Sequence, residues 1–128
     1  MSRFTDAEAQ FLDGQRLGRL ATLGPEGGPQ CRPVGFRLNR EFGTVDIGGY
    51  DLARTRKYRN IQADPRVSFV VDDLESIDPW RPRGVEIRGT AEALESESFG
   101  GRVGPLIRVR PIRILAWGLG SPDHPSPG

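Results

Sequence analysis

The segment "TRKYRNIQADPRVSFVV", residues 55–71, joins a cationic stretch to an apolar one. Asp51, just before it, is a residue type that caps helices, so we expect a short helix from Leu52 to about Gln62. An Asp-Pro dipeptide then ends the helix. The run RVSFVVD (66–72) is nearly continuous in apolar residues, which predicts a strand buried on both of its faces.

The sequence on either side of this segment predicts more strands and one more helix. FTDAEAQFLDGQ opens a helix with a capping box, in which Thr5 and Glu8 each satisfy a free backbone N–H. The expected strands are LGRLATL (17–23), QCRPVGFRLN (30–39), TVDIGG (44–49), VEIRGTAEAL (85–94) and a last pair, LIRVR and RILAWG, around Pro111. The expected loops are GPEGGP (24–29), DLESIDPWRPRG (73–84) and ESESFGGRVG (95–104). Seven or so short strands with two short helices predict a mainly β fold, a small antiparallel β-barrel.

Composition excludes several classes of protein. The chain has 128 residues, about the size of one domain, and a formal net charge of +1, which argues against nucleic acid as a partner. The single cysteine, Cys31, excludes an internal disulfide and fits a reducing compartment. With one histidine, a Cys/His metal cluster is excluded as well. No apolar run is long enough to span a membrane, so we expect a cytoplasmic protein without a membrane partner.

Residues 51–60, DLARTRKYRN, place four cations on one short helix. One interpretation is a solvated helix face, which is what most charge runs on short helices are. The other is an anion site, because Thr55, Arg56 and Lys57 combine a hydroxyl, a guanidinium and an ammonium group, which are the groups that hold a phosphate. Arg32, Gly35 and the Gly48–Gly49 pair, on the neighbouring strands, could form other walls of one pocket.

Four stretches resemble the pyridoxamine 5′-phosphate oxidase-like superfamily, whose members are flavin- and deazaflavin-binding split β-barrels. They are PQCRPVGFR (29–37), DIGG (46–49), TRKYRNIQADPRVSFVV (55–71) and RPIRILAWG (110–118). The third is the most specific match, and together they cover about Leu17 to Leu119. The resemblance implies an FMN-binding split barrel over residues 1–119. The tail over 120–128 has no apolar residues to bury, so we expect it to be disordered.

The resemblance also implies cofactor-binding residues, position by position. Thr55, Arg56 and Lys57 match the family's phosphate-binding group. The strand beside the cofactor ring and its ribityl chain is matched by Arg32, Pro33, Val34 and Arg37, and the next contact by Ile47 and Gly48. Trp117 matches the tryptophan that reaches the cofactor from the other subunit of a homodimer; its alternative role is a core or dimer-interface aromatic.

Two departures argue against vitamin B6 oxidation. The family's Arg-His segment after the tryptophan is missing, and His124 lies instead in the short tail. The family's cofactor-contacting glutamine is replaced near Gly84. FTDAEAQFL, DPWRPRGVEIRG and RILAWGL look most like the branch that uses the deazaflavin coenzyme F-420, whose anionic tail would suit the extra cations Arg54 and Arg59.

The resemblance therefore predicts an oxidoreductase that transfers a hydride from F-420 to an electron-poor small molecule. Two alternatives stay open: an FMN-binding oxidoreductase or electron carrier of the same fold, and a non-enzymatic cofactor-binding protein. No acid–base pair stands out as catalytic, so the catalytic residues are unknown. Trp80 and Arg83 could line the substrate side, or their segment could be only a rigid connection.

Overall fold

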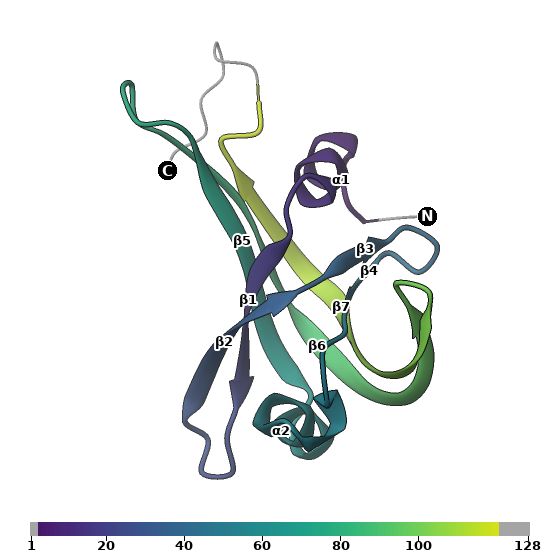
Figure 1. Ribbon diagram of the computed structural model, residues 1–128. Coiled ribbons are helices and arrows are strands. Elements are labelled where there is room, and N and C mark those ends of the chain that lie inside the picture. Colours follow the sequence, from purple (N-terminus) through teal and green to yellow (C-terminus); the bar gives the residue numbers. More distant parts are fainter. Residues whose placement is uncertain (1–2, 121–128) are drawn as a thin grey trace.

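The computed structural model describes residues 3–120, and these fold around one curved sheet (Figure 1). Two short α-helices and a 3₁₀ turn accompany its seven antiparallel strands, which confirms the predicted mainly β class. Of the predicted tail only Gly120 is described, and the rest, with His124, lies outside the described residues. Within them, no helix has the length and apolar character needed to cross a lipid bilayer. In chain order the elements are α1 (Asp6–Asp13), β1 (Leu17–Leu23), β2 (Pro29–Gly35), β3 (Arg37–Asn39), β4 (Thr44–Ile47), η1 (Leu52–Arg54), α2 (Arg56–Ala63), β5 (Arg66–Ser76), β6 (Arg81–Phe99) and β7 (Arg102–Trp117).

The order of the strands explains why the sheet curls. It runs β2-β1-β5-β6-β7-β4-β3, so β2 and β3 form its two edges. These two strands are separated in the sequence by Phe36 alone, so the sheet has to bend until its edges meet there. In Figure 1, β2 runs on into β3 across the face of the other strands. The described strands thus form a barrel that stays open between its two edges, which confirms the predicted split barrel.

The core lies on the concave side of the sheet. Phe36 plugs the gap between the edges, and its ring meets that of Phe69 edge-on with the centroids 5.2 Å apart. Phe69 is fully buried, as are Val71 and Ile87 on the same face. Burial along β5 nevertheless alternates, with Val70 only half-buried, so the prediction of a strand buried on both faces is wrong for the single chain. The nearly continuous apolar run of β5 therefore leaves one face of the strand partly exposed to solvent.

Two predicted loops turn out to be strands. β5 and β6 continue through residues 73–84 to a tight hairpin tip, and β6 and β7 continue through residues 95–104 to another. The predicted last pair of strands is one strand, β7, with a register shift where Pro111 faces Gly89. Proline has no N–H to donate to the hydrogen-bond ladder, and a bulge is a position where the ladder does not need one. A Cβ on Gly89 would stand 2.0 Å from the Arg110 carbonyl oxygen, so the close approach needs glycine.

The helix caps are set by threonines. In α1 the capping box of Thr5 and Glu8 is formed as predicted, with both hydrogen bonds present. In α2 the cap is Thr55, whose hydroxyl accepts the N–H of Tyr58. Asp51 makes no capping hydrogen bond and has a left-handed φ of 54°, so the prediction of a helix capped there is wrong. The 3₁₀ turn η1 separates Asp51 from the helix.

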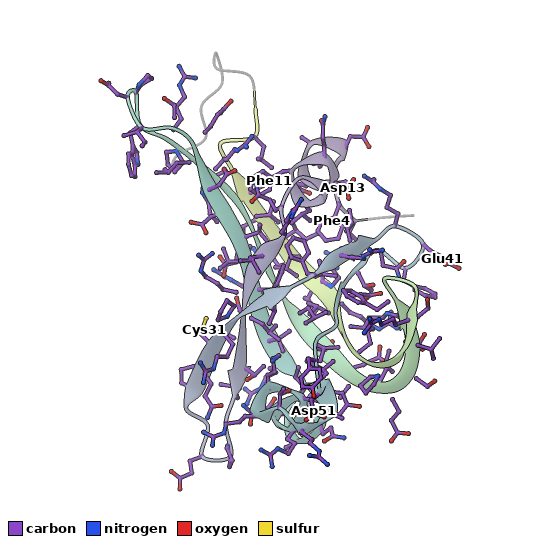
Figure 2. The ribbon with its side chains drawn as sticks, in the orientation of Figure 1. Phe4, Phe11, Asp13, Cys31, Glu41 and Asp51 are labelled. Carbon is purple, nitrogen blue, oxygen red and sulfur yellow. The ribbon has the colours of Figure 1, made fainter. Side chains whose placement is uncertain are left out.

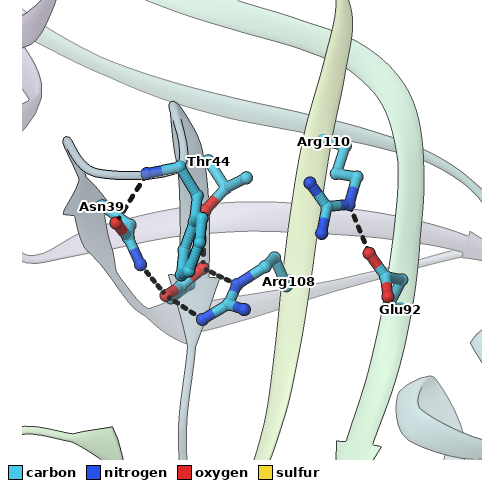
Figure 3. A network of polar contacts seen from close by, with 7 residues as sticks. Asn39, Thr44, Glu92, Arg108 and Arg110 are labelled. Carbon is cyan, nitrogen blue, oxygen red and sulfur yellow. Dashed lines mark hydrogen bonds and ion pairs between the residues drawn. The ribbon is translucent and has the colours of Figure 1, made fainter. Parts of the chain in front are cut away.

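A buried ion pair joins β4 to β7 (Figure 3). Arg108 donates to both carboxylate oxygens of Asp46 at 3.1 Å. The same carboxylate accepts the Thr44 hydroxyl and the Asn39 amide, each at 2.9 Å. The Phe42 ring covers the guanidinium, with its centroid 4.6 Å away. Asp46 and Arg108 are 4% and 6% exposed, so this network holds the edge strand β3 and its neighbour β4 against the sheet with its charges matched.

Candidate functional site

Three cations on α2 and one on the neighbouring β2 form the α2 cation cluster, which we define as Arg32, Arg56, Lys57 and Arg59. None of the four has an ion pair within residues 3–120, although eight ion pairs engage other arginines of the same region. Lys57 is the single lysine among the chain's 18 lysines and arginines. Cations left without counter-charges at one place favour the anion-site interpretation over a solvated face.

A buried amide holds α2 against β2. Asn60 is 5% exposed, and its amide donates to the Thr22 hydroxyl at 3.0 Å and to the Gln30 side-chain oxygen at 2.9 Å. Gln30 lies two residues before Arg32 on β2, so both side chains share one face of that strand. This clamp brings Arg32 to the first turn of the helix.

The electrostatics of the cluster are unfavourable without an anion. Partial burial lowers the pKa of Lys57, and the nearby Arg32 guanidinium lowers it further. The first turn of α2 contains no acidic residue, while that of α1 contains Asp6 and Glu8, as the helix dipole favours. The free N–H groups and the cations at the start of α2 therefore create a positive potential in one place, and a phosphate bound there would neutralise it.

Because Lys57 is the single lysine, its pKa can be measured without ambiguity. We expect reductively ¹³C-methylated protein to show one side-chain signal that titrates below the ordinary lysine range, since burial and Arg32 disfavour the charged form. An added phosphate-bearing cofactor should raise that pKa, because an anion favours the ammonium. A signal that titrates normally, and does not respond to cofactor, would contradict the placement of Lys57 in the site.

Thr55 is engaged in the backbone. Its hydroxyl donates to the Leu52 carbonyl at 2.6 Å while it accepts from Tyr58. A phosphate could therefore receive a hydrogen bond from this hydroxyl only if the hydroxyl left the Leu52 carbonyl. The predicted role of Thr55 stays a prediction, and its present role is to start the helix.

Three other predicted contacts, Val34, Ile47 and Pro33, are placed so that mainly their backbone could face a ligand. Val34 is 5% exposed and Ile47 is fully buried, so both side chains belong to the core. Pro33 alternates with Val34 and is exposed on the other face of β2. Because β2 is an edge strand, its outer N–H and C=O groups have no ladder partner and are open to a ligand or a second chain.

Arg37 and Gly48 are brought together at the β6–β7 hairpin instead of at α2. The Arg37 guanidinium stacks over the Phe99 ring, 5.6 Å from its centroid. The same ring lies so close to Gly48 that a Cβ there would stand 2.5 Å from it. Both residues therefore have a packing role at Phe99, and their part in cofactor binding stays a prediction.

Strand pairing within one chain does not bring Trp117 to the α2 cation cluster. In the sheet order, β1, β5 and β6 stand between its strand, β7, and β2. Its ring packs on Gly84, where a Cβ would stand 2.4 Å from the indole. The position where the resemblance expects a glutamine thus has no room for a side chain.

Sequence reasoning missed three polar groups that position the site: the Asn60 amide, the Asp46–Arg108 pair and a second pair between Asp73 and Arg83. Asp46 could have been found from the sequence, because an acid between Val45 and Ile47 in a strand needs a buried partner.

The structure also places the extra cations. Arg54, assigned above to an anionic tail, lies 3.9 Å from Asp51 and is highly exposed. Arg56 and Arg59 line a hollow of about 700 Å³ between α2 and the β1–β2 turn.

Comparisons with known proteins agree on the family. The family model described as pyridoxamine 5′-phosphate oxidase matches residues 4–111. A 5a,11a-dehydrotetracycline/5a,11a-dehydrooxytetracycline reductase of Streptomyces rimosus is 44% identical over 122 residues, which cover 91% of this chain and 84% of that protein.

Two solved structures show the same fold. A conserved hypothetical protein of Mycobacterium tuberculosis superposes with a TM-score of 0.74 at 24% identity, over 100% of this chain and 96% of the other. A structure described as an F-420 reductase superposes with a TM-score of 0.67 at 23% identity, over 88% of this chain and 98% of the other.

Proposed function

Because the chain belongs to the pyridoxamine 5′-phosphate oxidase family and is an oxidoreductase of the flavin or deazaflavin type, we propose that it is a cytoplasmic F-420-dependent reductase of an electron-poor small molecule. The observation that carries this proposal is the α2 cation cluster, whose four cations have no ion pair in residues 3–120. The cofactor, when bound, supplies a hydride to a polarised double bond.

The residues present fit a phosphate-bearing cofactor. Lys57, Arg56 and Arg32 would hold the phosphate at the start of α2. The open edge of β2 would present backbone N–H and C=O groups along the ribityl chain and the ring. No carboxylate or histidine is needed for this role, since the protein's task is to anchor the cofactor, orient its ring and exclude water from one face.

F-420 is preferred over FMN because the cations continue past the phosphate position. Arg59 lies one helical turn beyond Arg56, and both line the hollow beside the β1–β2 turn. An anionic tail extending from the phosphate would lie between these guanidinium groups, whereas FMN ends at its phosphate. The Streptomyces relative adds a substrate class, since its name describes reduction of a compound with a 5a,11a double bond.

A homodimer is part of the proposal. The convex face of the sheet carries the half-buried Val70 and Leu115 and the exposed Leu17, and Trp117 lies on the same face as Leu115. A second copy on this face would cover these side chains and bring a partner tryptophan toward the cofactor. Sedimentation equilibrium should then give twice the chain mass of 14.1 kDa, and a monomer at micromolar concentration would contradict it.

Fluorescence titration tests the choice of cofactor. We expect the purified protein to bind oxidised F-420 more tightly than FMN, because only F-420 reaches Arg59, and to oxidise reduced F-420 when a dehydrotetracycline is added. Tighter binding of FMN would move the protein to the FMN-dependent oxidoreductases or electron carriers. Binding of F-420 without turnover of any acceptor would favour a cofactor-binding protein, and binding of neither would refute the site.

A further inference from the structure

A second hollow lies at the other end of the β2 edge, between α1 and the β5–β6 hairpin near its tip. It has a cavity volume of about 360 Å³, within the range of small-molecule sites. Side chains from α1, from both strands of the hairpin and from the end of β7 line it. We call it the helix–hairpin pocket; the residues used below are Gln10, Phe11, Gln15, Glu75, Arg83 and Leu119.

One arginine of the pocket, Arg83, is fixed in position by hydrogen bonds. Arg83 donates to both oxygens of Asp73, at 2.6 and 3.0 Å, and the Gln15 amide donates to the same carboxylate at 2.8 Å. The guanidinium stacks over the ring of Phe11, an α1 residue labelled in Figure 2, 5.2 Å from the ring centroid. One terminal nitrogen of Arg83 has no hydrogen bond to any residue in 3–120, so it remains a donor for a ligand.

The wall opposite α1 depends on a close approach of two backbones. Gly118, at the end of β7, has a φ of +70°, and a Cβ there would stand 2.2 Å from the Pro82 carbonyl oxygen. The glycine therefore lets the chain after β7 lie directly on the strand that carries Arg83. Leu119 follows and packs against the core, which gives the pocket an apolar side.

The charges of the pocket select against an anion. Arg83 is already neutralised by Asp73, and Glu75 adds a further carboxylate with no hydrogen bond to the described residues. The pocket thus offers hydrogen-bond donors from Arg83 and Gln10, acceptors from Glu75, and an apolar side at Leu119. This combination suits an uncharged or zwitterionic ring system with several hydroxyl or keto oxygens.

The register of the sheet places this pocket in line with the α2 cation cluster. Arg32 pairs with Leu20, and Gly35, three residues on, pairs with Leu17. Gln15 lies two residues before Leu17, so about 17 Å separates the Arg32 position from the pocket along the strand direction. A cofactor anchored by its phosphate at α2 and extended along β2 would direct its ring toward the pocket.

We propose that the helix–hairpin pocket binds the oxygen-rich polycyclic substrate whose double bond is reduced, with Arg83 and Glu75 as its polar contacts. The proposal rests on the function proposed above and adds the location of the substrate. It requires that blocking the pocket impairs substrate binding and leaves the cofactor site intact.

Tetracycline, the product of reducing a 5a,11a-dehydrotetracycline, is the probe, and its binding is followed by calorimetry without cofactor. Gln10→Trp fills the pocket from an exposed position of α1, and Asp6→Trp adds the same ring on that helix outside the pocket lining. We expect Gln10→Trp to weaken tetracycline binding at least 10-fold and Asp6→Trp to change it less than 2-fold, with F-420 binding unchanged in both.

Equal tetracycline binding by the two variants, or no binding by the wild-type protein, would overturn the pocket proposal. Either result with normal F-420 binding would leave the proposed function standing. A wild-type protein that does not bind F-420 would instead refute the proposed function. Arg83→Lys serves as a further check, because it keeps the positive charge and removes the planar guanidinium with its several N–H donors. We expect a raised KM for the substrate and an unchanged Kd for the cofactor.

Discussion

Replacing Lys57 by alanine is expected to weaken F-420 binding by roughly 10- to 100-fold, since losing one hydrogen bond to a charged group costs about 1.5–3 kcal/mol. Lys57 is the cation of the α2 cation cluster whose pKa burial has lowered, so its ammonium is held in place at a desolvation cost. A partly buried ammonium without a carboxylate partner gains most when a phosphate binds. Fluorescence titration of the variant with oxidised F-420 measures the loss.

Two comparisons make the Lys57 result specific. Arg81→Ala removes an exposed cation without an ion pair in residues 3–120, at the far end of the β5–β6 hairpin, and should leave the F-420 Kd within about 2-fold. The melting temperature of Lys57→Ala should equal or exceed that of the wild type, because the variant removes an unpaired cation beside Arg32. Wild-type affinity in Lys57→Ala would show that the phosphate binds elsewhere.

The sequence predicted the elements whose signals are local. β1 has the predicted bounds Leu17–Leu23, and the capping box of α1 follows from Thr5 and Glu8 alone. The α2 cation cluster was also readable, because helix residues 56 to 59 lie on one turn whatever the rest of the chain does. Its fourth member, Arg32, is brought in by the amide of Asn60, which no local pattern revealed.

The long strands were missed for a physical reason. The segment 73–84 contains charges, two prolines and a glycine, which is the composition of a loop, yet it forms the two arms of a hairpin. Its strand pairing is supported by the Asp73–Arg83 ion pair between the two arms and, from outside the segment, by Trp117 packing on Gly84. Both contacts form only once the strands have paired, so propensity alone predicted the wrong state.

The α2 start was misplaced because two candidate caps stand close together. Asp51 and Thr55 are both good capping residues, and the sequence does not say which one has the extended backbone that a cap requires. Thr55 has that conformation, at φ −75° and ψ 154°, while Asp51 is left-handed. The correction matters for function, since it puts Arg56 and Lys57 in the first turn, where free N–H groups add to their field.

Replacing Arg108 by methionine is expected to destabilise the fold by about 3–5 kcal/mol, because the Asp46 carboxylate would stay buried without its counter-charge. Only Thr44 and Asn39 would still donate to it. Urea unfolding at pH 7 measures the loss. Arg110→Met, which breaks the neighbouring but exposed pair with Glu92, should cost less than about 1 kcal/mol (Figure 3).

A second substitution in the Arg108→Met variant separates a buried charge from simple loss of packing. Asp46→Asn in this background should recover stability at pH 7, because it removes the charge that Arg108 no longer balances. A double variant no more stable than the single one would show that Arg108 acts through the packing of its side chain on Phe42.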